Sequence, residues 1–219
     1  MKQDLAFLFD LDGVIIDTEP QFDILWRNLA QKHQLRIENF EYKIKGTTTP
    51  DIIRVFFSHL SDEEQEEIKV EILDFERGME IDFIPGAYEF LKKSREAGIK
   101  TALVTSSNDE KLKANFSKAP IRPLFDSVVS ANRITKGKPH PQPYLLAAEE
   151  LGVDPADCLV FEDSFNGIKS GIAAGMRVVG LSTTNPKESI EKDVFLVIPD
   201  FSEIISSEMF DRFVENVSK

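Results

Sequence analysis

The stretch "FLFDLDGVIIDTEP", residues 7–20, determines which fold class this sequence predicts. An apolar run from Phe7 to Phe9 leads directly into two carboxylates, Asp10 and Asp12, which Gly13 follows. Open α/β sheets bind ligands outside the carboxyl ends of their strands, and this pattern places both aspartates there. Two neighbouring carboxylates repel each other, so they need a cation or a proton on one of them. Mg²⁺ favours such oxygen ligands, and the same pair can supply a nucleophile and a general acid.

Two other interpretations of this stretch make different demands on its residues. An EF-hand calcium loop that begins at Asp10 does not fit, because Gln21 occupies the position of the bidentate glutamate. A pair of purely structural, capping aspartates remains open from these residues alone. Residues elsewhere in the chain are needed to distinguish structural aspartates from aspartates that bind a cation or take part in a reaction.

Short apolar runs alternate with amphipathic segments along most of the chain. This alternation predicts an α/β fold with a mostly parallel sheet and right-handed crossovers. Glycine ends several of the helical segments just before the next apolar run, which agrees with this pattern. The expected strands are residues 5–9, 100–104, 127–130, 158–161, 178–180 and 195–198, and the expected helices are 87–97, 109–118, 143–151, 166–174 and 203–217.

One segment, residues 18–83, shows only helical patterns. Its first helix carries an apolar stripe at i, i+3, i+4 and i+7 that starts at Phe22, and Ser61 with Glu64 fits a capping box. The acidic run "DEEQEE", residues 62–67, is typical of a solvated helix face. We therefore expect a core formed by residues 1–16 and 84–219, with an all-helical domain inserted at 17–83.

The composition restricts the classes of partner. The chain has 219 residues, of which 42% are hydrophobic and 29% charged, and its net charge of −12 argues against binding to nucleic acid. Cys158 is the only cysteine, so no internal disulfide can form. No apolar stretch approaches the roughly 18 residues of a membrane span, and the first residues lack the pattern of a signal peptide. We expect a cytoplasmic monomer that binds a small molecule.

Three further stretches place polar residues at expected strand ends. The sequence "LVTSSND", residues 103–109, puts Thr105, Ser106 and Ser107 before a helix, where hydroxyls favour an anion site. Ordinary helix capping by Ser107 or Asn108 is the alternative. The sequence "TKGKPHP", residues 135–141, offers Lys138 but lacks the glycine and hydroxyl of a P-loop. The sequence "LVFEDSFNG", residues 159–167, brings Glu162 and Asp163. Acid, hydroxyl, lysine and acid in this order indicate phosphate chemistry.

These four stretches together resemble the haloacid dehalogenase superfamily, in its phosphatase and β-phosphoglucomutase-like branch. "DLDGVIIDTEP", "LVTSS", "KGKPHPQPY" and "FEDSFNGI" are similar to the four family motifs and occur in the same order. The resemblance covers nearly the whole chain. It implies a Rossmann-like core with a small helical cap inserted after the first motif, which coincides with the insert expected from periodicity.

The resemblance also implies roles for individual residues. Asp10 attacks phosphorus and forms an aspartyl-phosphate, while Asp12 protonates the leaving group and then activates water. Thr105 binds the transferring phosphoryl group, and Lys138 neutralises charge around Asp10. The implied metal is Mg²⁺, held by Asp10, the backbone carbonyl of Asp12, Glu162 and Asp163. The expected phosphate- and substrate-binding residues are Ser106, Ser107, Thr47 and Lys45.

The choice of enzyme within the family rests on the inserted segment. A dehalogenase would leave Asp12, Glu162 and Asp163 without purpose. In a β-phosphoglucomutase the cap supplies an arginine and a histidine, whereas Thr49 and Phe22 stand near those positions here. Other cap cations that could serve are Lys45, Arg54 and Arg77. We therefore expect a Mg²⁺-dependent phosphohydrolase for a small phosphorylated metabolite such as a sugar phosphate, with a β-phosphoglucomutase, a pyrophosphatase and a non-catalytic binding module as alternatives.

Overall fold

The computed structural model describes residues 5–44 and 47–217 and contains one parallel sheet of six strands, in the order β3-β2-β1-β4-β5-β6. The strands are β1 (Ala6–Phe9), β2 (Lys100–Val104), β3 (Ser127–Val129), β4 (Cys158–Glu162), β5 (Arg177–Leu181) and β6 (Leu196–Ile198). The chain builds the sheet outward from β1 in one direction and then from β4 in the other. The point where this order reverses, between β1 and β4, is where doubly wound sheets bind their ligands. The predicted α/β fold is confirmed.

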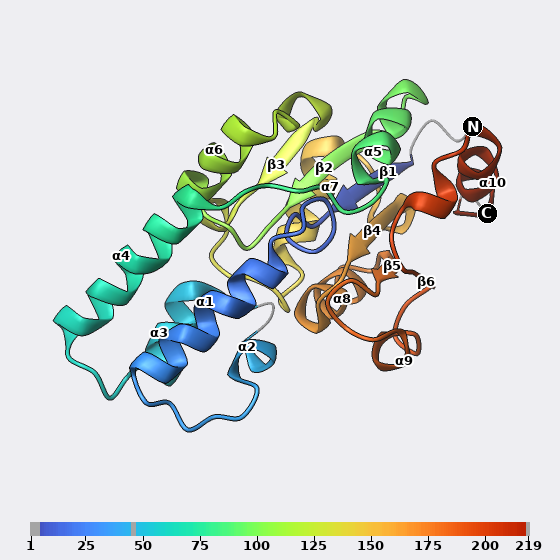
Figure 1. Cartoon of the computed structure of the whole chain (residues 1–219). Helices are drawn as coiled ribbons and strands as arrows, with labels where there is room; N and C mark the ends of the chain where they lie inside the picture. Colours follow the sequence, from blue (N-terminus) through green and yellow to red (C-terminus); the bar gives the residue numbers. More distant parts are fainter. Residues whose placement is uncertain (1–4, 45–46, 218–219) are drawn as a thin grey trace.

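The helices follow the sequence expectation closely, as Figure 1 shows. They are α1 (Glu19–Lys32), α2 (Phe40–Lys43), α3 (Thr49–Phe56), α4 (Asp62–Gly78), α5 (Ala87–Glu96), α6 (Asp109–Lys118), α7 (Gln142–Leu151), α8 (Phe165–Ala173), α9 (Lys187–Ile190) and α10 (Ser207–Val217). Short 3-10 helices lie at Arg122–Leu124, Ala131–Arg133, Pro155–Asp157 and Ser202–Ile204. The last α-helix begins at Ser207 and not near Glu203 as predicted, because a separate 3-10 turn precedes it.

The pleat of β1 divides the core into two layers. Phe7 and Phe9 point to one face, where α5 and α10 cover them, and Ala6 and Leu8 point to the other, under α7 and α8. The Phe9 ring stacks on Phe161 of β4 with 4.7 Å between the ring centroids. Burying aromatic rings of this size on both central strands stabilises the position of the strand ends that follow them.

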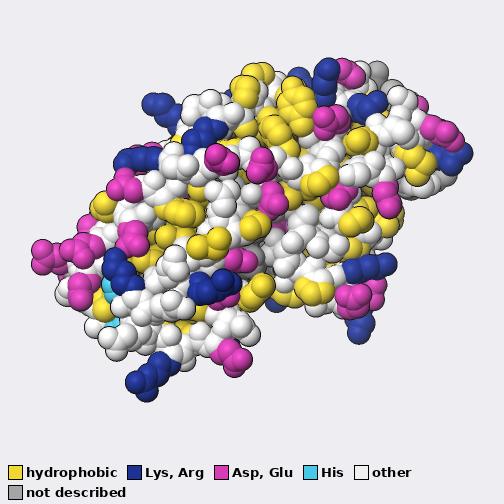
Figure 2. Space-filling view, viewed as in Figure 1, with side chains coloured by type: hydrophobic (Ala, Val, Ile, Leu, Met, Phe, Trp, Pro, Cys, Tyr) yellow, Lys and Arg dark blue, Asp and Glu magenta, His cyan; other side chains and the backbone are white. Residues whose placement is uncertain are grey.

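Helices α1–α4 lie between β1 and α5 in the chain and have a hydrophobic cluster of their own, which includes Trp26, Phe40 and Phe57. Figure 1 shows them beside the carboxyl edge of the sheet. The predicted capping box at the start of α4 is present, with Ser61 and Glu64 as its two members. The acidic run at this end of α4 is largely exposed, and Figure 2 shows acidic side chains gathered there.

Two adjacent chain crossings connect these helices to the sheet. The amide of Asp17 donates to the carbonyl of Asp82 at 2.8 Å, and the amide of Ile84 donates to the carbonyl of Ile15 at 3.1 Å. Ile16 and Phe83 form an antiparallel bridge between the two crossings. The segment therefore leaves and re-enters the core at a single place, next to Asp12.

Candidate active site

Asp10 and Lys138 form the centre of the site, at the switch point of the sheet. Asp10 is the first residue beyond β1, and its amide donates to the carbonyl of Phe161 at 3.0 Å, which extends the pairing with β4. The Nζ of Lys138 lies 2.8 Å from Oδ1 of Asp10 and 3.0 Å from the carbonyl oxygen of Val104. Only 4% of the Lys138 side chain is exposed. Its buried ammonium therefore holds the end of β1 to the end of β2.

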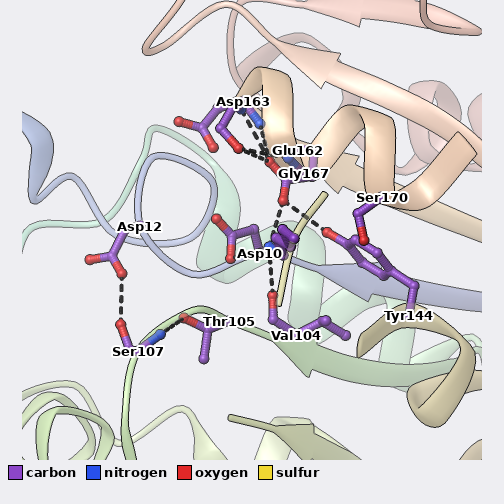
Figure 3. A network of polar contacts seen from close by, with 12 residues as sticks. Asp10, Asp12, Val104, Thr105, Ser107, Tyr144, Glu162, Asp163, Gly167 and Ser170 are labelled. Atoms are coloured by element: carbon purple, nitrogen blue, oxygen red, sulfur yellow. Dashed lines mark hydrogen bonds and ion pairs between the residues drawn. The ribbon is translucent and has the colours of Figure 1, made fainter. Parts of the chain in front are cut away.

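The same ammonium also contacts Glu162, a fully buried carboxylate at the end of β4. Oε1 of Glu162 accepts from Lys138 at 2.6 Å and from the hydroxyl of Tyr144 at 2.9 Å, while Oε2 accepts from the hydroxyl and amide of Ser164. A Cβ atom on Gly167 would lie 1.7 Å from Oε1, so only glycine leaves room for this carboxylate. Figure 3 shows the hydroxyl of Tyr144 directed toward the Glu162 carboxylate. Glu162 thus aligns Lys138 as well as the loop that follows β4.

Burial and neighbouring charge act on these groups in opposite directions. Burial raises the pKa of Asp10 to about 7 against the opposing effect of the Lys138 ammonium, and Glu162 adds to the rise. Burial alone would lower the pKa of Lys138, but Asp10 and Glu162 outweigh it and raise that pKa well above its usual value. One ammonium is therefore too little positive charge for the carboxylates that surround it.

The acidic groups at this edge fit a divalent cation. Carboxylate oxygens of Asp10, Glu162 and Asp163 lie within 4.8 Å of one another, and they form an oxygen donor set of the kind that Mg²⁺ prefers. With all three ionised and Lys138 protonated, the cluster has a formal charge of −2. Gly13, at a φ of +79°, keeps space at Asp163, because a Cβ atom there would lie 2.2 Å from Oδ2. Both the oxygen donor atoms and the net negative charge of the cluster suit a divalent cation.

Asp12 lies apart from this cluster and is held by donors on three sides. Its carboxylate accepts from the hydroxyl of Thr18 at 2.5 Å and from that of Ser107 at 3.1 Å, and Nζ of Lys111 lies 3.1 and 3.2 Å from its two oxygens. Burial would raise the pKa of Asp12, but Lys111 and these hydroxyls outweigh it and lower the pKa. Figure 3 shows Asp12 linked to Ser107 and separate from Asp10, which has other partners.

The end of β2 supplies the expected hydroxyl groups. Oγ1 of Thr105 accepts from the amide of Ser107 at 3.0 Å, so the Thr105 hydroxyl can still donate to a ligand. Asn108, and not a serine, caps α6 by accepting from the amide of Lys111. Thr105, Ser106 and Ser107 all line the same pocket as Asp10.

This pocket has a volume of about 320 Å³ and lies between the carboxyl edge of the sheet and the inserted helices. Thr47 lines it, whereas Lys45 lies outside the described residues. The expectation that Arg54 or Arg77 could serve as a cap cation is wrong for this arrangement, since neither lines the pocket. Arg54 pairs with Asp51 of its own helix, and Arg77 pairs with Asp74 and Glu110. The inserted helices contribute Phe22, Asp23, Trp26, Glu41, Ile44, Thr47, Thr48, Thr49, Pro50, Ile52 and Glu76.

Sequence reasoning missed Lys111, Thr18 and Tyr144. Lys111 is one of several lysines on α6, and nothing in the local pattern marks it as the one that faces Asp12. Thr18 falls within the first motif, so its place in "DTEP" was an available signal. Tyr144 lies in an amphipathic helix, where a buried tyrosine is indistinguishable from any other core residue.

A family model for haloacid dehalogenase-like hydrolases matches residues 5–175. With the sheet order, the acidic strand ends and the buried lysine already described, this match defines the class: the chain belongs to the haloacid dehalogenase-like hydrolases. Its curated relatives are phosphatases, and it is an enzyme of that type.

Individual relatives and solved structures are similar to this chain over most of its length. It is 35% identical over 179 residues to hexitol phosphatase A of Escherichia coli, which covers 81% of this chain and 82% of that protein. It is 31% identical to a fructose-1-phosphate phosphatase of Escherichia coli, which covers 80% of this chain and 94% of the relative. The crystal structure of a β-phosphoglucomutase from Clostridium difficile superimposes with a TM-score of 0.75 at 26% identity, over 98% of this chain and 99% of that one. No described helix is both long and apolar enough to cross a lipid bilayer.

Proposed function

We propose that this chain is a Mg²⁺-dependent phosphatase that hydrolyses a phosphate monoester of a small sugar or sugar alcohol. The observation that carries the proposal is the contact of Lys138 with both Asp10 and Glu162, beside a pocket lined by the hydroxyls of the β2 end. Phosphoryl transfer depends mainly on positioning and on electrostatic stabilisation, which such a set of groups supplies. The hexitol and fructose-1-phosphate phosphatases support the choice of ester.

The proposed reaction uses Asp10 as the nucleophile. Its carboxylate oxygen forms a bond to phosphorus as the ester P–O bond breaks, and Asp12, in its protonated form, gives its proton to the leaving oxygen. Asp12 then takes a proton from the water that hydrolyses the aspartyl-phosphate. Thr105 and Ser106 donate hydrogen bonds to the phosphoryl oxygens, and the ammonium of Lys138 offsets charge on them and on Asp10. A covalent carboxylate divides one difficult displacement into two easier ones.

Magnesium would be held by Asp10 and Asp163, with Glu162 beside them and the backbone carbonyl of Asp12 as a further ligand. When bound, a divalent cation of this kind neutralises charge on the phosphoryl group during its transfer. The donor set and the formal charge of the cluster support this assignment.

Removal of the metal is expected to abolish hydrolysis. Treatment of the purified protein with a chelator should reduce phosphate release from hexitol phosphates to background, because the charge of the acidic cluster would then repel the anionic substrate. Addition of Mg²⁺ in excess should restore the rate, whereas Ca²⁺ should not, since its coordination is larger and less regular. Full activity in the chelated protein would contradict the metal assignment.

We also propose that residues 17–83 form a cap domain on a core made of residues 1–16 and 84–219. The support is the pair of hydrogen-bonded crossings between Asp17 and Asp82 and between Ile84 and Ile15, together with the separate apolar cluster of the insert. Segments connected in this way can move as a unit about a few residues. Such a cap would close over the pocket and exclude bulk water from it.

The main alternative is a β-phosphoglucomutase, which the structural neighbours keep open. We expect phosphate release from hexose phosphates without appreciable conversion of β-glucose 1-phosphate to glucose 6-phosphate. The reason is that Thr49 and Phe22, at the two cap positions discussed above, are uncharged and line the pocket. A coupled assay with a bisphosphate activator checks this. Efficient conversion with slow phosphate release would instead favour the mutase.

A further inference from the structure

The wall that the inserted helices contribute to the pocket is acidic. It carries the carboxylates of Asp23, Glu41 and Glu76 and the hydroxyls of Thr47, Thr48 and Thr49. Among the described residues of the insert, no lysine or arginine lines the pocket. Glu41 is paired with Arg27 at 2.9 Å, so its charge is already offset. Glu76, in the last turn of α4, lines the pocket together with Lys111 and Asp12 and interacts electrostatically with both.

Glu76 shares an electrostatic environment with Lys111 and Asp12. Burial raises the pKa of Glu76, Lys111 opposes the rise, and Asp12 and Glu110 add to it. Lys111 lies against both oxygens of Asp12 and also over the ring of Phe22, with 4.5 Å between Nζ and the ring centroid. The ammonium of Lys111 therefore contacts Asp12 of the core and lines the same pocket as Glu76 of the insert, whose negative charge it stabilises.

The backbone of α4 is anchored to the core at this point. Nζ of Lys118, on α6, donates to the carbonyl oxygens of Arg77 and Met79, and the guanidinium of Arg77 lies 3.3 Å from Glu110. Lys118 satisfies carbonyls that the end of an α-helix leaves without partners. Since α6 carries Lys111 as well, the position of Glu76 relative to Lys111 is set by these contacts.

Lys111 and Lys138 are the lysines that line the described part of the pocket. Lys138 belongs to the phosphoryl site, which leaves Lys111 as the described cation closest to the remainder of a substrate. A second anionic group on the substrate would meet Glu76 and compete with it for Lys111. A hydroxyl group can instead donate a hydrogen bond to Glu76 and cause no repulsion of like charges.

We propose that Glu76 is a specificity-determining residue, which keeps Lys111 occupied and thereby selects monophosphates whose leaving group has no second negative charge. This inference rests on the proposed phosphatase function and adds the basis of its selectivity. The pocket accepts polyhydroxylated leaving groups through the Glu76 carboxylate and the three threonine hydroxyls. It discriminates against bisphosphates and against phosphorylated acids.

The test compares fructose 1-phosphate with fructose 1,6-bisphosphate, two substrates that differ by one distal phosphoryl group. We expect the Mg²⁺-loaded wild type to prefer the monophosphate by at least about tenfold in kcat/KM, since opposed like charges weaken binding strongly. Glu76→Gln should reduce this ratio by about fivefold or more. The matched control is Glu67→Gln, which removes the same charge from an exposed site on the same helix and should leave the ratio unchanged.

A double variant tests whether Lys111 is the cation that binds the second phosphoryl group of the bisphosphate. In Glu76→Gln/Lys111→Met, the gain toward the bisphosphate should disappear, and because the ratio is taken within one variant, any general loss of rate cancels. The inference is overturned if Glu76→Gln leaves the ratio within twofold of wild type, or if Glu67→Gln changes it equally. If p-nitrophenyl phosphate is the better substrate, the inhibition constants of the two sugar phosphates against it provide the same ratio. Failure of the wild type to hydrolyse any of these esters would reject the proposed function itself.

Discussion

Replacement of Asp10 by asparagine is expected to reduce phosphate release by about 10⁴-fold or more, the scale seen when a nucleophile is removed. The amide has the shape of the carboxylate but cannot form the acyl-phosphate bond, and it brings no negative charge to a metal. The measurement is phosphate release from a hexitol phosphate under single-turnover conditions. Asp211→Asn serves as the control, because it makes the same change at an exposed position of α10.

The fold of the Asp10→Asn variant should remain intact. In the metal-free protein its unfolding temperature should be at least that of wild type, because burial already raises the pKa of Asp10 and the substitution removes an unfavourable charge. Glu162 still pairs with Lys138 in this variant. Retention of more than about one hundredth of the turnover would show that water, and not Asp10, attacks phosphorus.

Replacement of Lys138 by methionine is expected to have the largest effect on stability. The ammonium pairs with Asp10 at 2.8 Å and with Glu162 at 2.6 Å, and the apolar side chain of methionine would leave these buried carboxylates without that partner. Breaking a buried ion pair from one side typically costs about 3–5 kcal/mol. Urea unfolding of the metal-free protein measures the loss. Lys136→Met, at an exposed position two residues earlier, should cost well under 1 kcal/mol, as is usual for surface sites.

The pH dependence of the stability of Lys138→Met distinguishes the loss of charge from the loss of packing. Without Lys138, the pKa of Asp10 should rise further above its unfolded-state value than the value of about 7 in wild type. The folded state then binds more protons than the unfolded state, so stability falls as pH rises. We expect the loss caused by Lys138→Met to be larger at pH 8 than at pH 5. An equal loss at both pH values would assign the effect to packing.

Local sequence patterns predicted most strands and helices, because hydrophobic periodicity reflects which side of each element is buried. Alternation of apolar runs with amphipathic segments predicted the strands and most helices to within a few residues, and the absence of strand patterns in residues 18–83 predicted the helical insert. The short helix α2, Phe40–Lys43, escaped detection because four residues are too few to establish a period. The last α-helix was placed too early, because the 3-10 turn at Ser202–Ile204 continues its apolar pattern.

The same patterns anticipated which residues meet at the carboxyl edge of the sheet. Asp10, Glu162 and Asp163 follow parallel strands, and parallel strands bring their carboxyl ends to one edge whatever their order. Lys138 belongs to the same pattern, but it lies well beyond the end of β3 at Val129, so its contact with Asp10 could not be predicted from the strand end alone. The catalytic roles of Lys138, Thr105 and Asp12 remain predictions.

The fold class, the place of the insert and the acidic edge of the sheet are predictable from sequence, because each depends on residues close together in the chain or on the common direction of the strands. The packing of distant elements was needed to show that Lys111 pairs with Asp12, 99 positions away, and that Glu76 lines the pocket while Arg54 and Arg77 pair elsewhere. Helical periodicity identifies the buried side of a helix. It does not identify which exposed side chains lie opposite another element, because that depends on how the helices pack against the sheet.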